Sequence, residues 1–195
     1  MLRALWAELA PLEERLLLAI HDQASPLLDG LFLISHDLGT VMFFAPLVVG
    51  LAFWHLHRGE RRLAGLWGVV GLSTYALQEG LKRLVGRPRP DLWPRLVDVG
   101  PYSFPSGHAL ASATLFPLLA WDLTRASGQR VRVLAVSAAA LLSLSIGLGR
   151  LYLGVHWPSD VVVGWGIGSL QCLVAARRLP SRHAERDPPG LPKNG

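Results

Sequence analysis

The chain has 195 residues, of which 51% are hydrophobic and only 17% are charged, whereas soluble domains usually carry about 25% charged residues. This length suits a single domain, and the composition excludes disordered, collagen-like and disulfide-rich secreted proteins. The formal net charge of +5 does not indicate nucleic-acid binding, because the basic residues stand in short clusters between long apolar runs, as they do beside membrane spans. We therefore expect an integral membrane protein.

The N-terminal segment is more polar than the rest of the chain. Residues 2–20 mix Leu with Glu and Arg, and this pattern is compatible with an interfacial helix within residues 1–26. Residues 27–34 are apolar but too short to cross a bilayer, and His36 and Asp37 follow them. These residues either extend the first span or form a sixth, re-entrant element.

Five stretches of 16 or 17 residues contain no Asp, Glu, Lys or Arg: residues 38–54, 63–78, 105–121, 133–149 and 161–176. A hydrocarbon core needs about 20 helical residues, so flanking residues must complete each span. The predicted fold class is all-α, a polytopic membrane helical bundle of five transmembrane helices, with six as the alternative. Gly164 and Gly168 form a G-x-x-x-G pair in the last stretch, which favours close helix packing.

Residues 1–180 are expected to form one membrane domain. Residues 181–195 end a segment rich in Pro, Arg and Gly, and we expect them to be disordered. A lone histidine near an interface is most often solvated. We expect this of four histidines: His21, His55, His57 and His183.

Alternation of five spans places the loops 79–104 and 150–160 on the same side of the membrane. The other side receives the tail from residue 177 and six arginines in two loops: Arg58, Arg61, Arg62, Arg125, Arg130 and Arg132. Excess positive charge marks the cytoplasmic face, so the two former loops are predicted to lie outside. The loop 79–104 is itself basic, and this prediction therefore depends on its cations having a chemical role.

Three polar clusters fall on that one side, at residues 82–90, 105–108 and 150–160. Ionisable groups at membrane depth are costly and are usually functional. Several cations without a matching number of acids suit a polyanion, and Arg can offer two donors to phosphate oxygens. A helix that starts at residues 106–108 would add backbone N–H groups for the same anion.

Two histidines in these clusters indicate phosphoryl transfer without a metal. The sequence has no G-x-x-x-x-G-K-[ST] loop and no cluster of carboxylates for Mg²⁺, and Cys172 stands alone. We therefore expect no metal or other cofactor. One of His108 and His156 can attack phosphorus while the other protonates the leaving oxygen. Asp160 follows His156 by four residues, so one helical turn can place its carboxylate against the imidazole.

The order and spacing of these residues resemble the tripartite signature of the type-2 phosphatidic acid phosphatase superfamily. The pattern in this chain is Lys82-x6-Arg89-Pro90, then Pro105-Ser106-Gly107-His108, then Arg150-x5-His156-x3-Asp160. The signature covers residues 82–160, and the remaining length agrees in hydropathy alone.

This resemblance implies a metal-independent membrane phosphatase that works through a phosphohistidine intermediate. It implies that His156 is the nucleophile, that Asp160 supports it, and that His108 protonates the leaving group. The matching positions imply five phosphate-binding residues: Lys82, Arg89, Ser106, Gly107 and Arg150. One departure is Gly149, where the family usually has Ser, so a hydrogen bond from that hydroxyl is expected to be absent.

The predicted function is hydrolysis of a lipid phosphate or diphosphate at the outer face of a bacterial inner membrane. Candidate substrates are undecaprenyl diphosphate, phosphatidylglycerol phosphate and phosphatidate, and the expected partners are this lipid and the bilayer. The alternative enzyme is a lipid phosphotransferase. A third interpretation is an anion transporter, which does not explain a His-x3-Asp pair beside a second histidine.

The distribution of charge gives a test of sidedness. In a Cys172→Ser background, Pro94→Cys should react with a membrane-impermeant maleimide added to intact cells, whereas Ser127→Cys should be spared because the two loops face opposite sides. Both cysteines should react after lysis, which is the control for accessibility. The reverse pattern in intact cells would place the polar clusters in the cytoplasm.

Overall fold

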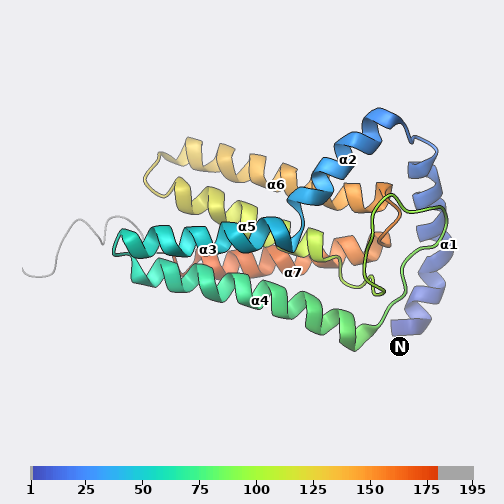
Figure 1. The fold of residues 1–195 in the computed structure, drawn as a ribbon, viewed down its shortest axis with the longest axis horizontal. Helices are drawn as coiled ribbons and strands as arrows, with labels where there is room; N and C mark the ends of the chain where they lie inside the picture. The colour runs from blue at the N-terminus through green and yellow to red at the C-terminus, as the bar shows by residue number, and fades with distance from the viewer. Residues whose placement is uncertain (1, 180–195) are drawn as a thin grey trace, which may run out of the picture.

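The computed structural model describes residues 2–179, so the tail 181–195, which was expected to be disordered, lies outside it. The regular elements of this range are seven helices: α1 (Leu2–His21), α2 (Pro26–Leu38), α3 (Val41–His57), α4 (Arg61–Val85), α5 (Gly107–Leu123), α6 (Gln129–Tyr152) and α7 (Pro158–Ala176). Helices α3 to α7 run side by side along the long axis, and α1 lies across one end of them (Figure 1). The long loop between α4 and α5 lies at that same end.

Helices α3 to α7 coincide with the five stretches that lack charged residues. By length and composition, α6 and α7 are apolar and long enough to cross a membrane, and α1 with α2 would make a third span if the bent pair were counted as one. Helix α3 is apolar but has only 17 residues. The all-helical membrane fold is thus confirmed by the described residues and by the structural relatives reported below. The number of spans, five or six, stays a prediction.

The apolar segment 27–34 belongs to a helix of its own rather than to the first long span. Helix α2 begins at Pro26 behind Ser25, whose side chain accepts a hydrogen bond from the Leu28 N–H. It ends at Gly39, and α3 begins after Thr40. The axes of α1 and α2 differ by 118°, so α1 turns away over the end of the bundle.

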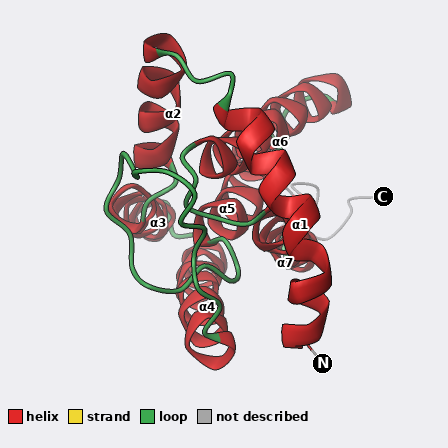
Figure 2. Cartoon of the chain, turned by 90° about the vertical axis from the view of Figure 1, so that its right-hand side faces the viewer, coloured by secondary structure: helices red, strands yellow, loops and turns green. Residues whose placement is uncertain are grey.

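Helix α5 lies at the centre of the bundle, with the other long helices around it (Figure 2). Two glycines of α7 allow its backbone to approach α5 closely. A Cβ on Gly164 would lie 2.7 Å from the Ser106 carbonyl oxygen, and a Cβ on Gly168 would collide with the Leu110 carbonyl oxygen. The close packing predicted from the G-x-x-x-G pair is therefore confirmed, and it fixes the start of α5 beside the start of α7.

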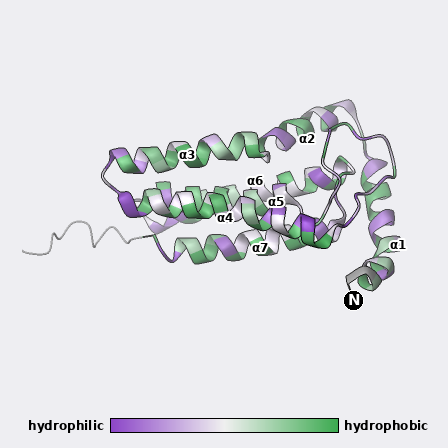
Figure 3. Ribbon diagram, turned by 60° about the horizontal axis from the view of Figure 1, so that its bottom comes forward, coloured by the Kyte–Doolittle hydropathy of each residue, from purple (hydrophilic) through white to green (hydrophobic). Residues whose placement is uncertain are grey.

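The outward faces of the long helices are apolar, and polar residues gather at the two ends of the bundle (Figure 3). Large hydrophobic side chains are exposed along α3, α4, α6 and α7, among them Phe53, Leu72, Leu134 and Leu170. Exposed apolar surface of this extent suits a lipid environment rather than water.

One expectation for the histidines was wrong. His55 is fully buried at the end of the bundle away from α1, where its Nδ1 lies 2.6 Å from Glu60 Oε2 and its Nε2 lies 2.8 Å from Asp122 Oδ2. Trp67 Nε1 also donates to Asp122, and Arg125 Nε lies 2.8 Å from the other oxygen of that carboxylate. Arg125 Nη2 also lies 3.3 Å from Glu60 Oε2, so His55 and Arg125 together join the two carboxylates.

Of the other three histidines, His57 is exposed as expected. His21 is half-buried and stacks on Trp93 with 4.1 Å between the ring centroids. His183 lies outside the described residues.

Replacement of His55 should destabilise the bundle strongly. The change His55→Ala removes the ring that contacts both Glu60 and Asp122 and leaves Arg125 alone between the two carboxylates. Loss of a hydrogen bond to a charged group typically costs about 1.5–3 kcal/mol. Thermal or denaturant unfolding in detergent should show this loss. His57→Ala, two residues away and exposed, is the matched control and should unfold like the wild type; equal behaviour of both variants would contradict the structural role of His55.

Candidate active site

The first polar cluster begins on the last turn of α4. Lys82 Nζ lies 3.3 Å from Glu79 Oε1, and the helix stops at Gly86, whose φ of 61° is left-handed and suits glycine. The chain then turns across the end of the bundle, which carries Arg87 and Arg89 inward. Arg89 Nη1 donates to the Val155 carbonyl oxygen at 2.6 Å, and so the first cluster is joined to the third.

The second cluster forms the start of α5. Ser106 caps this helix through its side chain, and its backbone N–H donates to the Asp160 carbonyl oxygen at 3.0 Å. Gly107 follows, and a Cβ there would displace the side-chain amide of Gln78 and lie 3.7 Å from Lys82 Nζ. The free N–H groups at this helix start therefore lie close to the lysine ammonium group, as an anion site requires.

The third cluster joins the end of α6 to the start of α7. Arg150 is 1% exposed and His156 is 2% exposed. His156 Nε2 lies 3.1 Å from Arg89 Nη1, and the charges of Arg89, Arg150 and Lys82 all act on its imidazole. All eight residues predicted for the site thus lie at one end of the bundle, the end that α1 covers.

Asp160 is close to His156 but is hydrogen-bonded to other groups. The distance from His156 Nδ1 to Asp160 Oδ2 is 3.6 Å, and this buried nitrogen has no hydrogen-bond partner among residues 2–179. Asp160 Oδ2 instead accepts from the Trp157 N–H at 2.9 Å, and Asp160 Oδ1 accepts from Arg87 Nη1 at 2.6 Å.

Arg87 and Glu13 are two residues that the sequence analysis did not assign to the site. Arg87 is 4% exposed, and its Nη2 donates to Glu13 Oε2 on α1 at 2.6 Å while Nη1 donates to Asp160 and Ser159. Glu13 in turn accepts from the backbone and side chain of Ser159. Arg87 stands two residues before Arg89 of the first motif, and this spacing could have indicated that it lies near the site. Nothing in the sequence connects Glu13 with Asp160.

His36 was also missed as a site residue. It stands near the end of α2, where its Nδ1 lies 2.5 Å from Arg150 Nη1 and 3.1 Å from His108 Nε2. Helix α2 also accounts for Gly149: a Cβ there would lie 2.6 Å from Ser35 Oγ and 2.9 Å from Phe32 Cδ1. A serine at position 149 would force Ser35 or Phe32 to move, and the Ser35 hydroxyl lies beside the glycine.

Burial and neighbouring positive charges lower the pKa values of His156 and Arg89, which face each other in the loops of the site. Burial, together with the charges of Arg89, Arg150 and Lys82, holds the pKa of His156 well below its usual range. Burial, with the charge of Arg95, lowers the pKa of Arg89 to about 10, although Asp160 opposes this. At neutral pH the His156 imidazole is therefore neutral, with a lone pair free for attack, and Arg89 remains charged.

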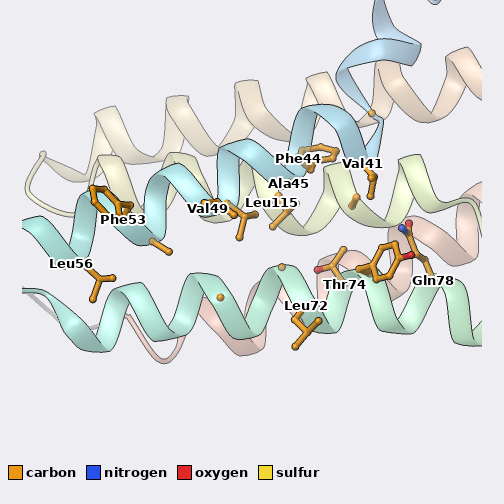
Figure 4. Close-up of a pocket in the computed structure, with 17 residues that line it drawn as sticks. Val41, Phe44, Ala45, Val49, Phe53, Leu56, Leu72, Thr74, Gln78 and Leu115 are labelled. Carbon is orange, nitrogen blue, oxygen red and sulfur yellow. The ribbon is translucent and has the colours of Figure 1, made fainter.

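An apolar groove of about 640 Å³ runs between α3 and α4 (Figure 4). Its walls are apolar along most of the length, with Phe44, Val49, Phe53 and Leu72 among the lining residues. Its polar end is at Gln78, the side chain that contacts Gly107. Gly39 also lines this groove, and a Cβ there would collide with His108. The groove thus ends beside the second polar cluster.

A metal site requires that several potential ligands, the side chains of His, Cys, Asp and Glu, lie close together. Within residues 2–179, no three His, Cys, Asp or Glu side chains are grouped so that they could hold a metal ion. The groups that converge on His156 are cations, which suit an anion.

Comparison with known proteins gives consistent matches. A family model described as the PAP2 superfamily matches residues 63–184. The chain is 31% identical over 143 residues to a phosphatidylglycerophosphatase B of Bacillus subtilis, a match that covers 70% of this chain and 68% of that protein. It is 44% identical over 68 residues to an undecaprenyl-diphosphatase of Sulfolobus acidocaldarius, covering 35% of this chain and 29% of that protein.

Two solved structures share the fold. The transmembrane PAP2 type phosphatidylglycerolphosphate phosphatase from Bacillus subtilis aligns with a TM-score of 0.79 at 25% identity, covering 93% of this chain and 89% of that one. Aquifex aeolicus LpxE aligns with a TM-score of 0.64 at 25% identity, covering 84% of this chain and 93% of that one. Similarity therefore extends well beyond the three motifs, to nearly the whole helical arrangement.

The lowered pKa of His156 predicts how the acid limb of the pH profile responds to Arg89. Because the charge of Arg89 favours neutral imidazole, Arg89→Gln should raise the pKa of His156 and move the acid limb of kcat/KM to higher pH. Both proteins are measured on the same substrate, so that titration of the substrate cancels. Arg83→Gln, which removes an exposed cation of α4, is the control and should leave the limb in place. A limb that stays fixed or moves to lower pH in Arg89→Gln would contradict this assignment.

Proposed function

We propose how this chain, which belongs to the PAP2 superfamily and is a membrane lipid phosphatase, carries out its reaction. His156 Nε2 attacks phosphorus, and the bond from phosphorus to the lipid oxygen breaks as the nitrogen–phosphorus bond forms. His108, in its doubly protonated form, gives a proton to the departing oxygen and becomes neutral. Water then attacks the phosphohistidine, His108 takes a proton from that water, and the nitrogen–phosphorus bond breaks to release phosphate and restore His156.

The observation that carries this proposal is the environment of His156. It is a buried imidazole whose Nε2 lies 3.1 Å from Arg89 Nη1 and whose pKa is held well below the usual range by burial and by three cations. A neutral nucleophile surrounded by cations suits attack on a dianionic phosphoryl group, because the cations bind the anion without protonating the nucleophile.

Five residues are proposed to bind the phosphoryl oxygens. Lys82, Arg89 and Arg150 supply positive charge, and Ser106 and Gly107 supply the start of α5. Asp160, which is 3.6 Å from His156 Nδ1, is proposed to stabilise the imidazole when it becomes a positively charged phosphohistidine. In the structure Arg87 holds the other oxygen of this carboxylate, and so fixes its place.

The proposed substrates are lipid phosphates or diphosphates: undecaprenyl diphosphate, phosphatidylglycerol phosphate or phosphatidate. The apolar groove between α3 and α4 supports this class, because a hydrocarbon chain can lie along it while the head group reaches Gly107. The relatives whose names give an activity are phosphatases, which favours water over another acceptor for the phosphoryl group.

We further propose that α3 to α7 cross a bacterial inner membrane with the site on the extracytoplasmic face. The α3–α4 and α5–α6 turns lie together at the end of the bundle away from α1 and the long loop (Figure 1). These turns and their flanks carry the arginines expected on the cytoplasmic side, including Arg58, Arg62 and Arg125.

Phosphate release from lipid substrates tests the proposed reaction. Purified protein in detergent micelles should release inorganic phosphate from at least one of the three lipids, and excess chelator should not reduce the rate. His156→Ala should lower kcat by at least about a thousandfold on every substrate, because no other group replaces the nucleophile. His57→Ala should retain the wild-type rate. Chelator inhibition reversed by Mg²⁺, or substantial turnover by His156→Ala, would overturn the mechanism.

A further inference from the structure

His36 lies where the end of α2 meets the starts and ends of the catalytic helices. Its Nδ1 lies 2.5 Å from Arg150 Nη1 and 3.1 Å from His108 Nε2, and its carbonyl oxygen lies 3.2 Å from the same His108 nitrogen. The rings of His36 and His108 are stacked, with 5.0 Å between centroids and 12° between planes. His36 therefore contacts both a proposed phosphate ligand and the proposed general acid.

These contacts fix where the protons lie. A guanidinium group can only donate, so His36 Nδ1 accepts from Arg150, and the proton of the neutral His36 ring is on Nε2. His108 Nε2 faces two acceptors, namely Nδ1 and the carbonyl oxygen of His36. An unprotonated nitrogen there would face lone pairs only, so His108 carries a proton on Nε2.

We propose that His36 is a positioning residue for the phosphatase reaction, one that keeps the proton on His108 Nε2 and holds Arg150 beside it until substrate binds. This inference rests on the proposed function. When phosphate arrives, Arg150 exchanges His36 for a phosphoryl oxygen. The leaving oxygen then takes the Nε2 proton of a doubly protonated His108: the nitrogen–hydrogen bond breaks, the new oxygen–hydrogen bond forms, and the nitrogen keeps the electron pair, which leaves a neutral imidazole with its remaining proton on Nδ1.

A purely structural role does not fit the partners of His36. His55, the buried histidine at the other end of the bundle, has carboxylates on both ring nitrogens and joins two acids of neighbouring segments. His36 instead has an arginine and a histidine as partners, and the interaction adds no neutralising charge. Its single lone pair orders two groups of the site, and this is useful for catalysis rather than for folding.

Three substitutions of His36 separate the Nδ1 acceptor from the rest of the side chain. Asn places its amide oxygen close to the position of Nδ1, so His36→Asn keeps an acceptor for Arg150 and His108. Gln places its amide group near the position of Nε2, so His36→Gln keeps the size and polarity but not the acceptor. His36→Ala removes both. The exposed residue His57 gives the control His57→Ala.

The assay uses two lipids with the same acyl chains and different leaving groups, phosphatidate and diacylglycerol diphosphate. Departure of an alkoxide from phosphatidate needs the proton of His108 far more than departure of a phosphate from the diphosphate does. Loss of a hydrogen bond to a charged group typically changes an equilibrium or rate constant by about tenfold to hundredfold. His36→Ala should therefore lower kcat on phosphatidate by about this factor, change kcat on the diphosphate much less, and raise KM for both lipids because Arg150 is less well ordered.

The conservative variants decide the role of Nδ1. His36→Asn should recover most of the lost kcat on phosphatidate, and His36→Gln should resemble His36→Ala. His108→Ala provides the reference for complete loss of the acid and should show the same preference for the diphosphate, to a greater degree. His57→Ala should match the wild type on both lipids.

Several results would overturn the inference while leaving the proposed function intact. These are wild-type kinetics in His36→Ala, equal loss of kcat on both lipids, or no advantage of His36→Asn over His36→Gln. If His36→Ala has a lowered thermal midpoint, the comparison of the Asn and Gln variants decides alone. Failure of the wild-type protein to release phosphate from any lipid would refute the proposed function itself, and the two failures are therefore distinguishable.

Discussion

Repulsion among buried cations governs one end of this molecule. Arg87 forms ion pairs with Asp160 and Glu13, and Lys82 pairs with Glu79, but no carboxylate of the described residues forms an ion pair with Arg89 or Arg150. Arg89 is bonded to backbone carbonyl oxygens and to His156, while Arg150 has only the neutral nitrogen of His36 as a hydrogen-bond partner for its side chain within the described residues. A phosphate group would relieve this repulsion, since it brings two negative charges to cations that are already desolvated. The same field keeps His156 neutral, and thus the binding groups also prepare the nucleophile.

The scaffold must hold these groups together against their repulsion, and it does so through close helix contact. Gly164 and Gly168 let α7 approach α5 until the starts of the two helices are joined by the hydrogen bond from Ser106 to Asp160. At the opposite end, His55 links Glu60 with Asp122 and so ties the α3–α4 turn to α5. Close contact thus fixes the bundle at both ends, and the groove between α3 and α4 lies between them.

The two N-terminal helices complete the site from outside the three motifs. Helix α1 brings Glu13 to Arg87, and α2 brings His36 to Arg150 and His108. Ser35 and Phe32 of α2 also occupy the space that a side chain at position 149 would need. The family usually has a serine where this chain has Gly149, and here the hydroxyl of Ser35 on α2 lies next to the place that the serine side chain would take.

The sequence by itself determined those features that depend on local pattern. Stretches without charge placed the long helices, most ends to within four residues, because a helix end near a membrane surface is marked by Arg, Lys and capping residues close in the chain. The exception is the end of α4, which continues seven residues beyond its stretch through Glu79, Lys82 and Arg83. The G-x-x-x-G pair predicted the close packing of the last helix, and the motif spacing selected eight residues that lie at one end of the bundle. Only the tertiary structure decided how charge is shared among them. The Arg87–Glu13 pair joins residues 74 positions apart, and the Arg150–His36 contact joins residues 114 apart. The roles of Arg87, His36 and the buried His55 could not be predicted from the sequence because a histidine or arginine beside an apolar run has the same local pattern whether its partner is water, a carboxylate or another cation. What distinguishes these cases is burial and the identity of the facing group, and both are set by helix packing.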